Sequence, residues 1–192
     1  MDKHYLTPLF APQTVAVFAG RDEDEGLQHP QAKALHEALR AQRFTGRLVF
    51  LDIHTSGTLA DLAQSRADLA IIALPHEDIR TALEVAGRMG CRSVMVISSG
   101  IGADLAAQLR EIAENEGMFL LGPNCMGLQR PALQLNASVA GPLARAGSLA
   151  LVSQSGALTA SILDWARNNA VGFSSVVSVG PNTAIDIAQV LD

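Results

Sequence analysis

This 192-residue sequence has few aromatic residues, few cysteines and no cluster of positive charge. Aromatic residues make up 4% of the chain, and the formal net charge is −5 with no run of Lys or Arg, so no nucleic-acid-binding surface is expected. The two cysteines, Cys91 and Cys125, provide neither a disulfide framework nor the spacing of a metal site. No apolar stretch reaches membrane-spanning length and no signal-peptide pattern is present, so we expect a protein of the reducing cytoplasm.

Small and aliphatic residues are abundant instead. Hydrophobic residues make up 48% of the sequence, mostly Ala, Leu and Val, which is typical of helices that pack closely on a parallel sheet. Short apolar runs alternate with helical patterns along the chain. The predicted strands are 14–19, 48–51, 69–74, 93–97 and 118–121, and the predicted helices are 30–42, 59–63, 77–89 and 103–116. This alternation predicts an α/β fold with a Rossmann-like, doubly wound parallel sheet.

The sequence divides into an arm and two predicted domains. Residues 1–12 are expected to be an arm without regular structure, because Pro8 and Pro12 interrupt it. The first domain is predicted over 13–140, and a loop-rich stretch over 122–146 marks its end.

The second predicted domain covers 147–192. It reads as a strand, a helix over 155–168, a strand over 175–179 and the opening of another helix. A doubly wound domain does not finish in about 45 residues, so we expect the sequence to be a piece of a longer protein.

The stretch 147–159 organises this second unit. It reads as a buried strand that passes through a tight turn at Ser153, Ser155 and Gly156 into the start of a helix. The free N–H groups at such a helix start favour a phosphate or carboxylate. Ordinary capping of the helix by Ser153 or Ser155 is the alternative interpretation.

Ligands of doubly wound sheets bind beyond the carboxyl ends of the strands. An acid at the end of the second strand, here Asp52, could hold a ribose and would favour NAD, although the first turn lacks the glycine pattern of NAD-binding proteins. The candidate positions by this rule are Ala19–Arg21, Asp52, Pro75–His76, Ser98–Gly100 and Gly122–Asn124.

Several motifs carry a resemblance to a known family. They are Gly122–Leu128, Asn136–Ser138, Leu151–Leu158, Ile162–Ala166, Gly172–Ser174, Val179–Gly180, Ile185–Ile187 and Leu9–Val17. Together they resemble the NDP-forming acyl-CoA synthetase superfamily, which includes the α subunit of succinyl-CoA synthetase. The nearest resemblance is to the bacterial branch that is fused to a GNAT-class protein lysine acetyltransferase. It covers nearly the whole sequence.

This resemblance implies a CoA-binding Rossmann-like domain followed by the start of a flavodoxin-like domain. The ligand would be coenzyme A or an acyl-CoA thioester. The implied CoA-binding residues are Gly20, Arg21, Pro75, Ile97, Ser98 and Ser99, and Ser155 and Gly156 match the helix start that cradles the phosphate of a phosphohistidine. Asn124 is a further candidate that either binds ligand or stabilises its turn.

No catalytic residue is predicted within this sequence. The phosphorylated histidine of the family lies beyond Asp192, so we expect no ligase turnover from these residues alone. Cys125 is interpreted as a structural turn residue and His36 as a surface or packing residue, whereas His76 lies at a strand end without an identified partner.

The sequence departs from the family pattern at two places in the first domain. The turn after the first strand carries four acids, Asp22–Glu25, that would repel a diphosphate if they faced it, with Arg21 as the nearby countercharge. The second strand is followed by Asp52-Ile53-His54 where the family usually has a lysine that reaches the phosphates.

Several functions remain open on the sequence alone. The full protein would be an NDP-forming acyl-CoA ligase, or an acetyltransferase that this region regulates by sensing acyl-CoA. An NAD-binding module and a degenerate domain that serves as a scaffold are the alternatives. The expected partners are the CoA thioester, the remaining domains of the protein and a second copy of the chain.

Replacing Asp22–Glu25 by a glycine-rich segment tests the role of the acidic turn. If these carboxylates face the pocket, their removal strengthens CoA binding because it removes repulsion of the diphosphate. Isothermal titration measures the change, and an unchanged dissociation constant would show that the acids point away from the ligand.

Overall fold

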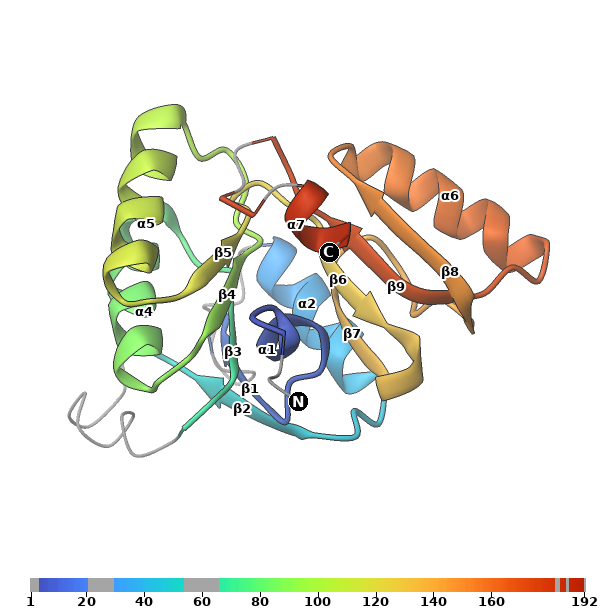
Figure 1. Cartoon of the computed structure of the whole chain (residues 1–192), viewed down its shortest axis with the longest axis horizontal. Coiled ribbons are helices and arrows are strands. Elements are labelled where there is room, and N and C mark those ends of the chain that lie inside the picture. The colour runs from blue at the N-terminus through green and yellow to red at the C-terminus, as the bar shows by residue number, and fades with distance from the viewer. Residues whose placement is uncertain (1–3, 21–29, 54–65, 182–183, 186, 192) are drawn as a thin grey trace.

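Figure 1 shows a computed structural model that describes residues 4–20, 30–53, 66–181, 184–185 and 187–191. Its first sheet has five parallel strands in the order β2-β1-β3-β4-β5. The strands are β1 (Thr14–Phe18), β2 (Arg47–Leu51), β3 (Leu69–Ile72), β4 (Ser93–Val96) and β5 (Phe119–Leu121). The predicted α/β fold with a doubly wound parallel sheet is confirmed.

Helices cover both faces of the first sheet, which is why its central strands read as continuous apolar runs. Helices α4 (His76–Arg88) and α5 (Ala103–Asn115) pack on one face, through residues such as Leu83 and Leu109. Helix α2 (Pro30–Arg40) packs on the other through Leu35 and Leu39. In Figure 1, α4 and α5 form the left-hand layer of the molecule.

A second sheet covers the same face as α2. Its strand order is β7-β6-β9-β8, with β6 antiparallel to both of its neighbours and β8 parallel to β9. The elements are β6 (Gly127–Arg130), the 3₁₀ turn η1 (Pro131–Leu133), β7 (Leu135–Ser138), β8 (Ala146–Ser153), α6 (Gly156–Asn168), β9 (Phe173–Ser178) and the short α7 (Ile187–Leu191). Helix α6 lies on the outer face of this sheet, at the right of Figure 1.

The prediction of loop over 122–146 is wrong for residues 127–138, which form β6, η1 and β7. Each strand is only four residues long and carries a buried polar side chain, Gln129 in β6 and Asn136 in β7, so neither reads as an apolar run. Gln129 donates to the Pro142 carbonyl at 3.2 Å and accepts from the Ala144 N–H at 3.0 Å, and Asn136 donates to the Gly141 carbonyl at 3.0 Å. These bonds offset part of the cost of burying the two amide side chains, although the buried Oδ1 of Asn136 has no hydrogen-bond partner among the described residues.

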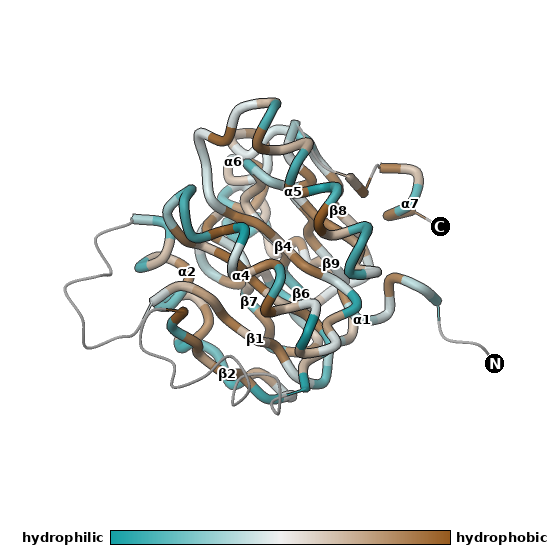
Figure 2. The backbone as a smooth tube through the Cα atoms, turned by 90° about the vertical axis from the view of Figure 1, so that its left-hand side faces the viewer, coloured by the Kyte–Doolittle hydropathy of each residue, from teal (hydrophilic) through white to brown (hydrophobic). Residues whose placement is uncertain are grey.

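The two sheets share one hydrophobic core. Leu128 of β6 and Val177 of β9 pack in the same cluster as Val17 and Met95 of the first sheet. Figure 2 shows these apolar segments as brown stretches of β1, β4 and β9 in the interior. The change from one sheet to the other falls between β5 and β6, at residues 122–126, and the predicted domain limits at 140 and 147 stay a prediction.

The N-terminal arm contains a helix, contrary to the prediction for residues 1–12. Helix α1 (Thr7–Phe10) has Pro8 in its first turn, where a proline needs no N–H partner. Leu6 and Leu9 are fully buried against the first sheet, so packing rather than helix propensity stabilises this turn. The predicted helix over 59–63 lies outside the described residues. Within the described part of the chain, no helix is long and apolar enough to cross a membrane.

Two leucines of α6 provide a matched test of the second core. Leu163 is buried with Phe173 and Val176, whereas Leu158 is 53% exposed on the same helix. Leu163→Ala should lower the free energy of unfolding by about 2–4 kcal/mol, because it leaves a cavity under the helix. Leu158→Ala should change it by less than about 0.5 kcal/mol. Chemical denaturation measures both, and equal effects would contradict the assigned packing of α6.

Candidate functional site

The carboxyl ends of β1, β3 and β4 lie side by side, because these strands are neighbours in a parallel sheet. The order 2-1-3-4-5 reverses direction between β1 and β3, which is where open α/β sheets bind ligands. The structure brings most of the predicted residues of the first domain to this edge. They are Gly20 after β1, Pro75 after β3, Ile97, Ser98 and Ser99 after β4, and Asn124 after β5.

The turn after β1 opens on Gly20, whose φ of +78° favours a residue without a side chain. A Cβ atom placed on Gly20 meets no atom within 4 Å among the described residues. The Gly20 carbonyl accepts a hydrogen bond from Nε2 of His36 at 3.2 Å. Arg21 and the acidic residues Asp22–Glu25 lie outside the described residues, so their predicted roles stay predictions.

The loop after β4 begins with two buried residues, which are followed by the exposed Ser99 and Gly100. Ser98 is fully buried, and its hydroxyl donates to the Leu74 carbonyl at 2.7 Å and accepts from the Leu74 N–H at 3.0 Å. Ile97 is also fully buried and bonds to β3 through its backbone. These side chains therefore hold the loops together and do not reach solvent, whereas Ser99 and Pro75 are exposed. Which of them contacts a ligand stays a prediction.

Asn124 stabilises its turn and the neighbouring loop. Its carboxamide accepts from the Ile101 N–H at 3.0 Å and donates to the Ile101 carbonyl at 2.8 Å. Its own N–H donates to the Ser98 carbonyl at 3.2 Å, and its φ is +59°. Of the two sequence interpretations of Asn124, the structure shows the turn-stabilising one, and both polar ends of its side chain are engaged there.

Cys125 follows in the same turn and is buried. Burial raises the pKa of its thiol to about 12, so the thiol stays protonated at neutral pH. Its Sγ donates to the Val96 carbonyl at 3.4 Å. These features agree with a structural turn cysteine. Among the residues that the structure describes, no three His, Cys, Asp or Glu side chains are grouped to hold a metal ion.

A serine caps the start of α6, which was the alternative to a phosphate site in the sequence analysis. Ser155 is the N-cap, and its hydroxyl accepts from the Leu158 N–H at 3.3 Å. Ser153 accepts from the Ser155 N–H at 3.1 Å and so fixes the turn after β8. A Cβ atom on Gly156 would collide with the Met126 side chain, so the helix start lies directly against the turn that follows β5.

Both predicted sites therefore adjoin residues 122–126. This segment closes the carboxyl edge of the first sheet through Asn124, and it contacts the helix start of the second through Met126. The Met126 N–H donates to the Ser178 hydroxyl at the end of β9, at 3.1 Å. The carboxyl ends of the strands in the two sheets meet at this turn.

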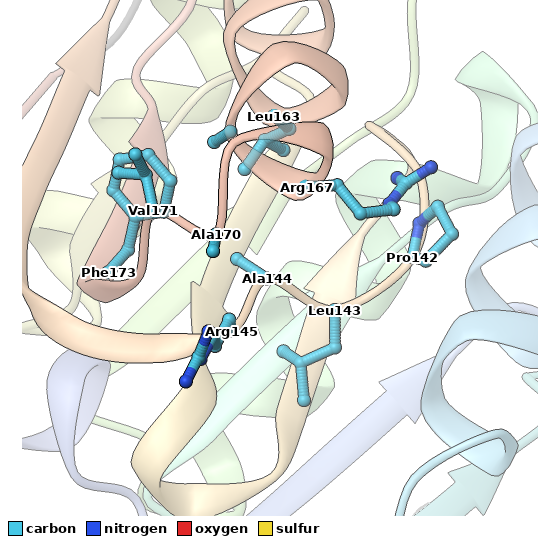
Figure 3. Close-up of a pocket in the computed structure, with 10 residues that line it drawn as sticks. Pro142, Leu143, Ala144, Arg145, Leu163, Arg167, Ala170, Val171 and Phe173 are labelled. Atoms are coloured by element: carbon cyan, nitrogen blue, oxygen red, sulfur yellow. The ribbon is translucent and has the colours of Figure 1, made fainter.

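A cavity of about 410 Å³ lies away from both sites. Figure 3 shows it between the loop before β8 and the C-terminal part of α6, where Leu163 and Phe173 contribute to an apolar wall. Arg145 and Arg167 are its charged lining residues. It lies at the end of α6 opposite to Ser155, so it takes no part in the predicted phosphate site.

Two residues at the carboxyl edge, His36 and Gln31, were not predicted as part of the site, and a third, His76, was a candidate position without an identified partner. His36 and His76 donate to carbonyls of the Gly20 turn and the Ser99 loop, and Gln31 accepts from the Ser99 N–H at 3.1 Å. One signal was available for His36, because it shares the buried stripe of α2 with Leu35 and Leu39. Burial lowers the pKa of His36, and the bond to Gly20 partly offsets this effect.

Comparison with known proteins agrees with this arrangement. Residues 49–131 match the family described as CoA binding domain, and residues 146–192 match the succinyl-CoA ligase like flavodoxin domain. The α subunit of the ADP-forming acetate–CoA ligase I of Pyrococcus furiosus is 38% identical over 97% of this chain. The corresponding subunit of ligase II from the same organism is 35% identical over 97% of the chain. The chain belongs to the NDP-forming acyl-CoA synthetase superfamily.

A solved structure shows the same fold. The dinucleotide-forming acetyl-coenzyme A synthetase 1 of Ca. Korarchaeum cryptofilum, in complex with phosphate and ADP, superposes with a TM-score of 0.82 at 25% identity. The match covers 97% of this chain and 42% of that chain. The present chain likewise spans 43% and 42% of the two Pyrococcus subunits, less than half of their length.

Replacing Asn124 tests the turn between the sheets. Asn124→Ala should lower the free energy of unfolding by about 2 kcal/mol, because it leaves the Ile101 N–H and carbonyl without their partner. Asn169→Ala is the matched control: that amide donates to the Trp165 carbonyl on the exposed end of α6, and we expect its loss to cost about 0.5 kcal/mol or less. Urea denaturation of both variants measures the difference, and a cost as small as that of the control would contradict the structural role of Asn124.

Proposed function

We propose that this chain binds coenzyme A or an acyl-CoA at the carboxyl edge of its first sheet, as part of an NDP-forming acyl-CoA synthetase. The observation that carries the proposal is the meeting of three loops, at Gly20, Pro75 and Ser99, at the point where the strand order reverses. The family match over 49–131 supports the same ligand. CoA would lie across these loops, and the Gly20 turn would contact its diphosphate.

The residues present at this edge are compatible with such a ligand. None of the described residues fills the space where a side chain of Gly20 would stand, so they leave room for phosphate oxygens near the backbone. Ser99 and Pro75 are exposed on the other side of the point where the strand order reverses. In this proposal the side chains of Ile97, Ser98 and Asn124 do not contact the ligand. They support the loops instead, because they are buried or already hydrogen-bonded.

We place a second, phosphate-binding function at the start of α6. The Ser155 hydroxyl is engaged by the Leu158 N–H, so the backbone amides of the first turn, Gly156 among them, would supply the donors. The contact between Met126 and Gly156 keeps this helix start close to the CoA edge. The reaction class that suits this pair of sites is acyl transfer between an acyl phosphate and the thiol of CoA.

The remaining domains of the protein are proposed to pack against the outer side of the second sheet. Strand β8 is an edge strand, and Leu149 on it is 54% exposed. Trp165 on α6 is 58% exposed. Apolar residues in these positions favour a covering partner, with a second copy of the chain as the other candidate.

Other functions raised by the sequence are less well supported. An acyl-CoA-sensing role beside an acetyltransferase domain uses the same CoA edge and differs only in the rest of the protein. NAD binding would depend on Asp52, which follows β2 and is half-buried. The two buried free thiols, Cys91 and Cys125, are compatible with the proposed cytoplasmic location.

Isothermal titration with CoA, acetyl-CoA and NAD, each added to the same chain, tests the proposed function. We expect saturable binding of CoA or acetyl-CoA and none of NAD. Ser99→Trp should weaken CoA binding roughly tenfold or more, because the indole would fill the space beside the loop. Ser161→Trp, on the exposed surface of α6, is the matched control and should bind CoA like the unmodified chain.

The alternatives predict different titrations. Binding of NAD alone would favour a dinucleotide-binding module, and the absence of binding by all three ligands would favour a scaffold. Unchanged CoA affinity in Ser99→Trp would place the ligand elsewhere on the molecule.

A further inference from the structure

Two histidines of the first domain form side-chain hydrogen bonds to backbone carbonyls of neighbouring loops. Nε2 of His36, on α2, lies 3.2 Å from the Gly20 carbonyl oxygen. Nε2 of His76, the first residue of α4, lies 2.9 Å from the Ser99 carbonyl oxygen. A carbonyl oxygen only accepts, so Nε2 carries the hydrogen in both rings. Each histidine therefore donates to the backbone of a loop at the carboxyl edge.

The surroundings of His36 show that this bond is specific. The side chain is 3% exposed and stacks on Phe50 of β2, with ring centroids 4.7 Å apart. It sits between Leu35 and Leu39 in the apolar stripe of α2, where an aliphatic residue would fill the space without the cost of burying an imidazole. The bond to Gly20 is one interaction that an aliphatic residue could not make.

The two peptide groups that flank Ser99 are held from opposite faces of the sheet. Its N–H donates to Gln31 at the start of α2, at 3.1 Å, while its carbonyl accepts from His76 at the start of α4. Helices α2 and α4 cover opposite faces of the first sheet. The backbone of the loop after β4 therefore has a fixed orientation at Ser99, although the Ser99 side chain itself is exposed.

We propose that His36 and His76 are positioning residues for CoA binding, each fixing one loop peptide by donating a hydrogen bond to its carbonyl oxygen. This inference rests on the proposed CoA site. In a trans peptide the C=O and N–H groups point in opposite directions, so holding the Ser99 carbonyl also sets the direction of the Gly100 N–H. A loop whose N–H groups are oriented beforehand loses less entropy when a ligand binds.

The test compares glutamine with asparagine at each position. The amide nitrogen of Gln is as many bonds from the backbone as Nε2 of His, whereas that of Asn corresponds to Nδ1 and falls short of the carbonyl. We expect His36→Asn and His76→Asn each to weaken CoA binding about fivefold, and the Gln variants to stay within about twofold of the unmodified chain. Isothermal titration with CoA gives the affinities, and thermal unfolding of every variant is recorded alongside.

A control separates positioning from stability. Leu163→Ala, in the second core, should lower the unfolding temperature but leave CoA affinity unchanged. His76 is exposed, so its two variants do not disturb the core and give a result even if those of His36 unfold. Equal affinities for Asn and Gln variants at both positions would overturn the inference while leaving CoA binding intact. If the unmodified chain itself did not bind CoA, the proposed function and this inference would both fall.

Discussion

The close approach of the chain to itself at residues 122–126 is the constraint on which the rest of the structure depends. Gly122 has a φ of +86°, and a Cβ atom there would collide with the Val96 carbonyl, so only glycine lets the chain leave β5 this close to β4. The same segment then bonds to Ile101 through Asn124 and touches Gly156 through Met126. The distance between the two carboxyl edges is therefore set by this short segment, through the backbone at Gly122 and the side chains of Asn124 and Met126.

Polar side chains at this edge serve mainly to hold backbone in place. The hydroxyl of Ser98, the carboxamide of Asn124 and the imidazoles of His36 and His76 all bond to main-chain groups of other loops. Within the described part of this edge, these bonds fix the orientation of main chain that lies beside the exposed Ser99. Such a surface suits a phosphate-bearing molecule, because peptide N–H groups bind phosphate without a dedicated positive side chain.

The first sheet and α6 were predictable from the sequence because their signals are local. Apolar runs such as Leu69–Ile72 and the helical stripe of α4 determine element type without reference to the rest of the chain. Strands β6 and β7 escaped prediction because Gln129 and Asn136 are buried through bonds to a later loop. The partners of His36 and His76 lie 16 and 23 residues away, so no local pattern indicates them. Residues that join different elements around a site can therefore be identified only once the fold is known.

The antiparallel pairing of β6 with β9 has a consequence for how the chain is made. Gly127 pairs with Ser178, about fifty residues later, so the centre of the second sheet cannot form until β9 has left the ribosome. Until then, the apolar face of the first sheet around Val17 and Met95 lacks the cover that Leu128 and Val177 later provide. A nascent chain at this stage exposes an aggregation-prone apolar surface. Chaperones, or rapid synthesis of the last segment, would then determine the yield of folded protein.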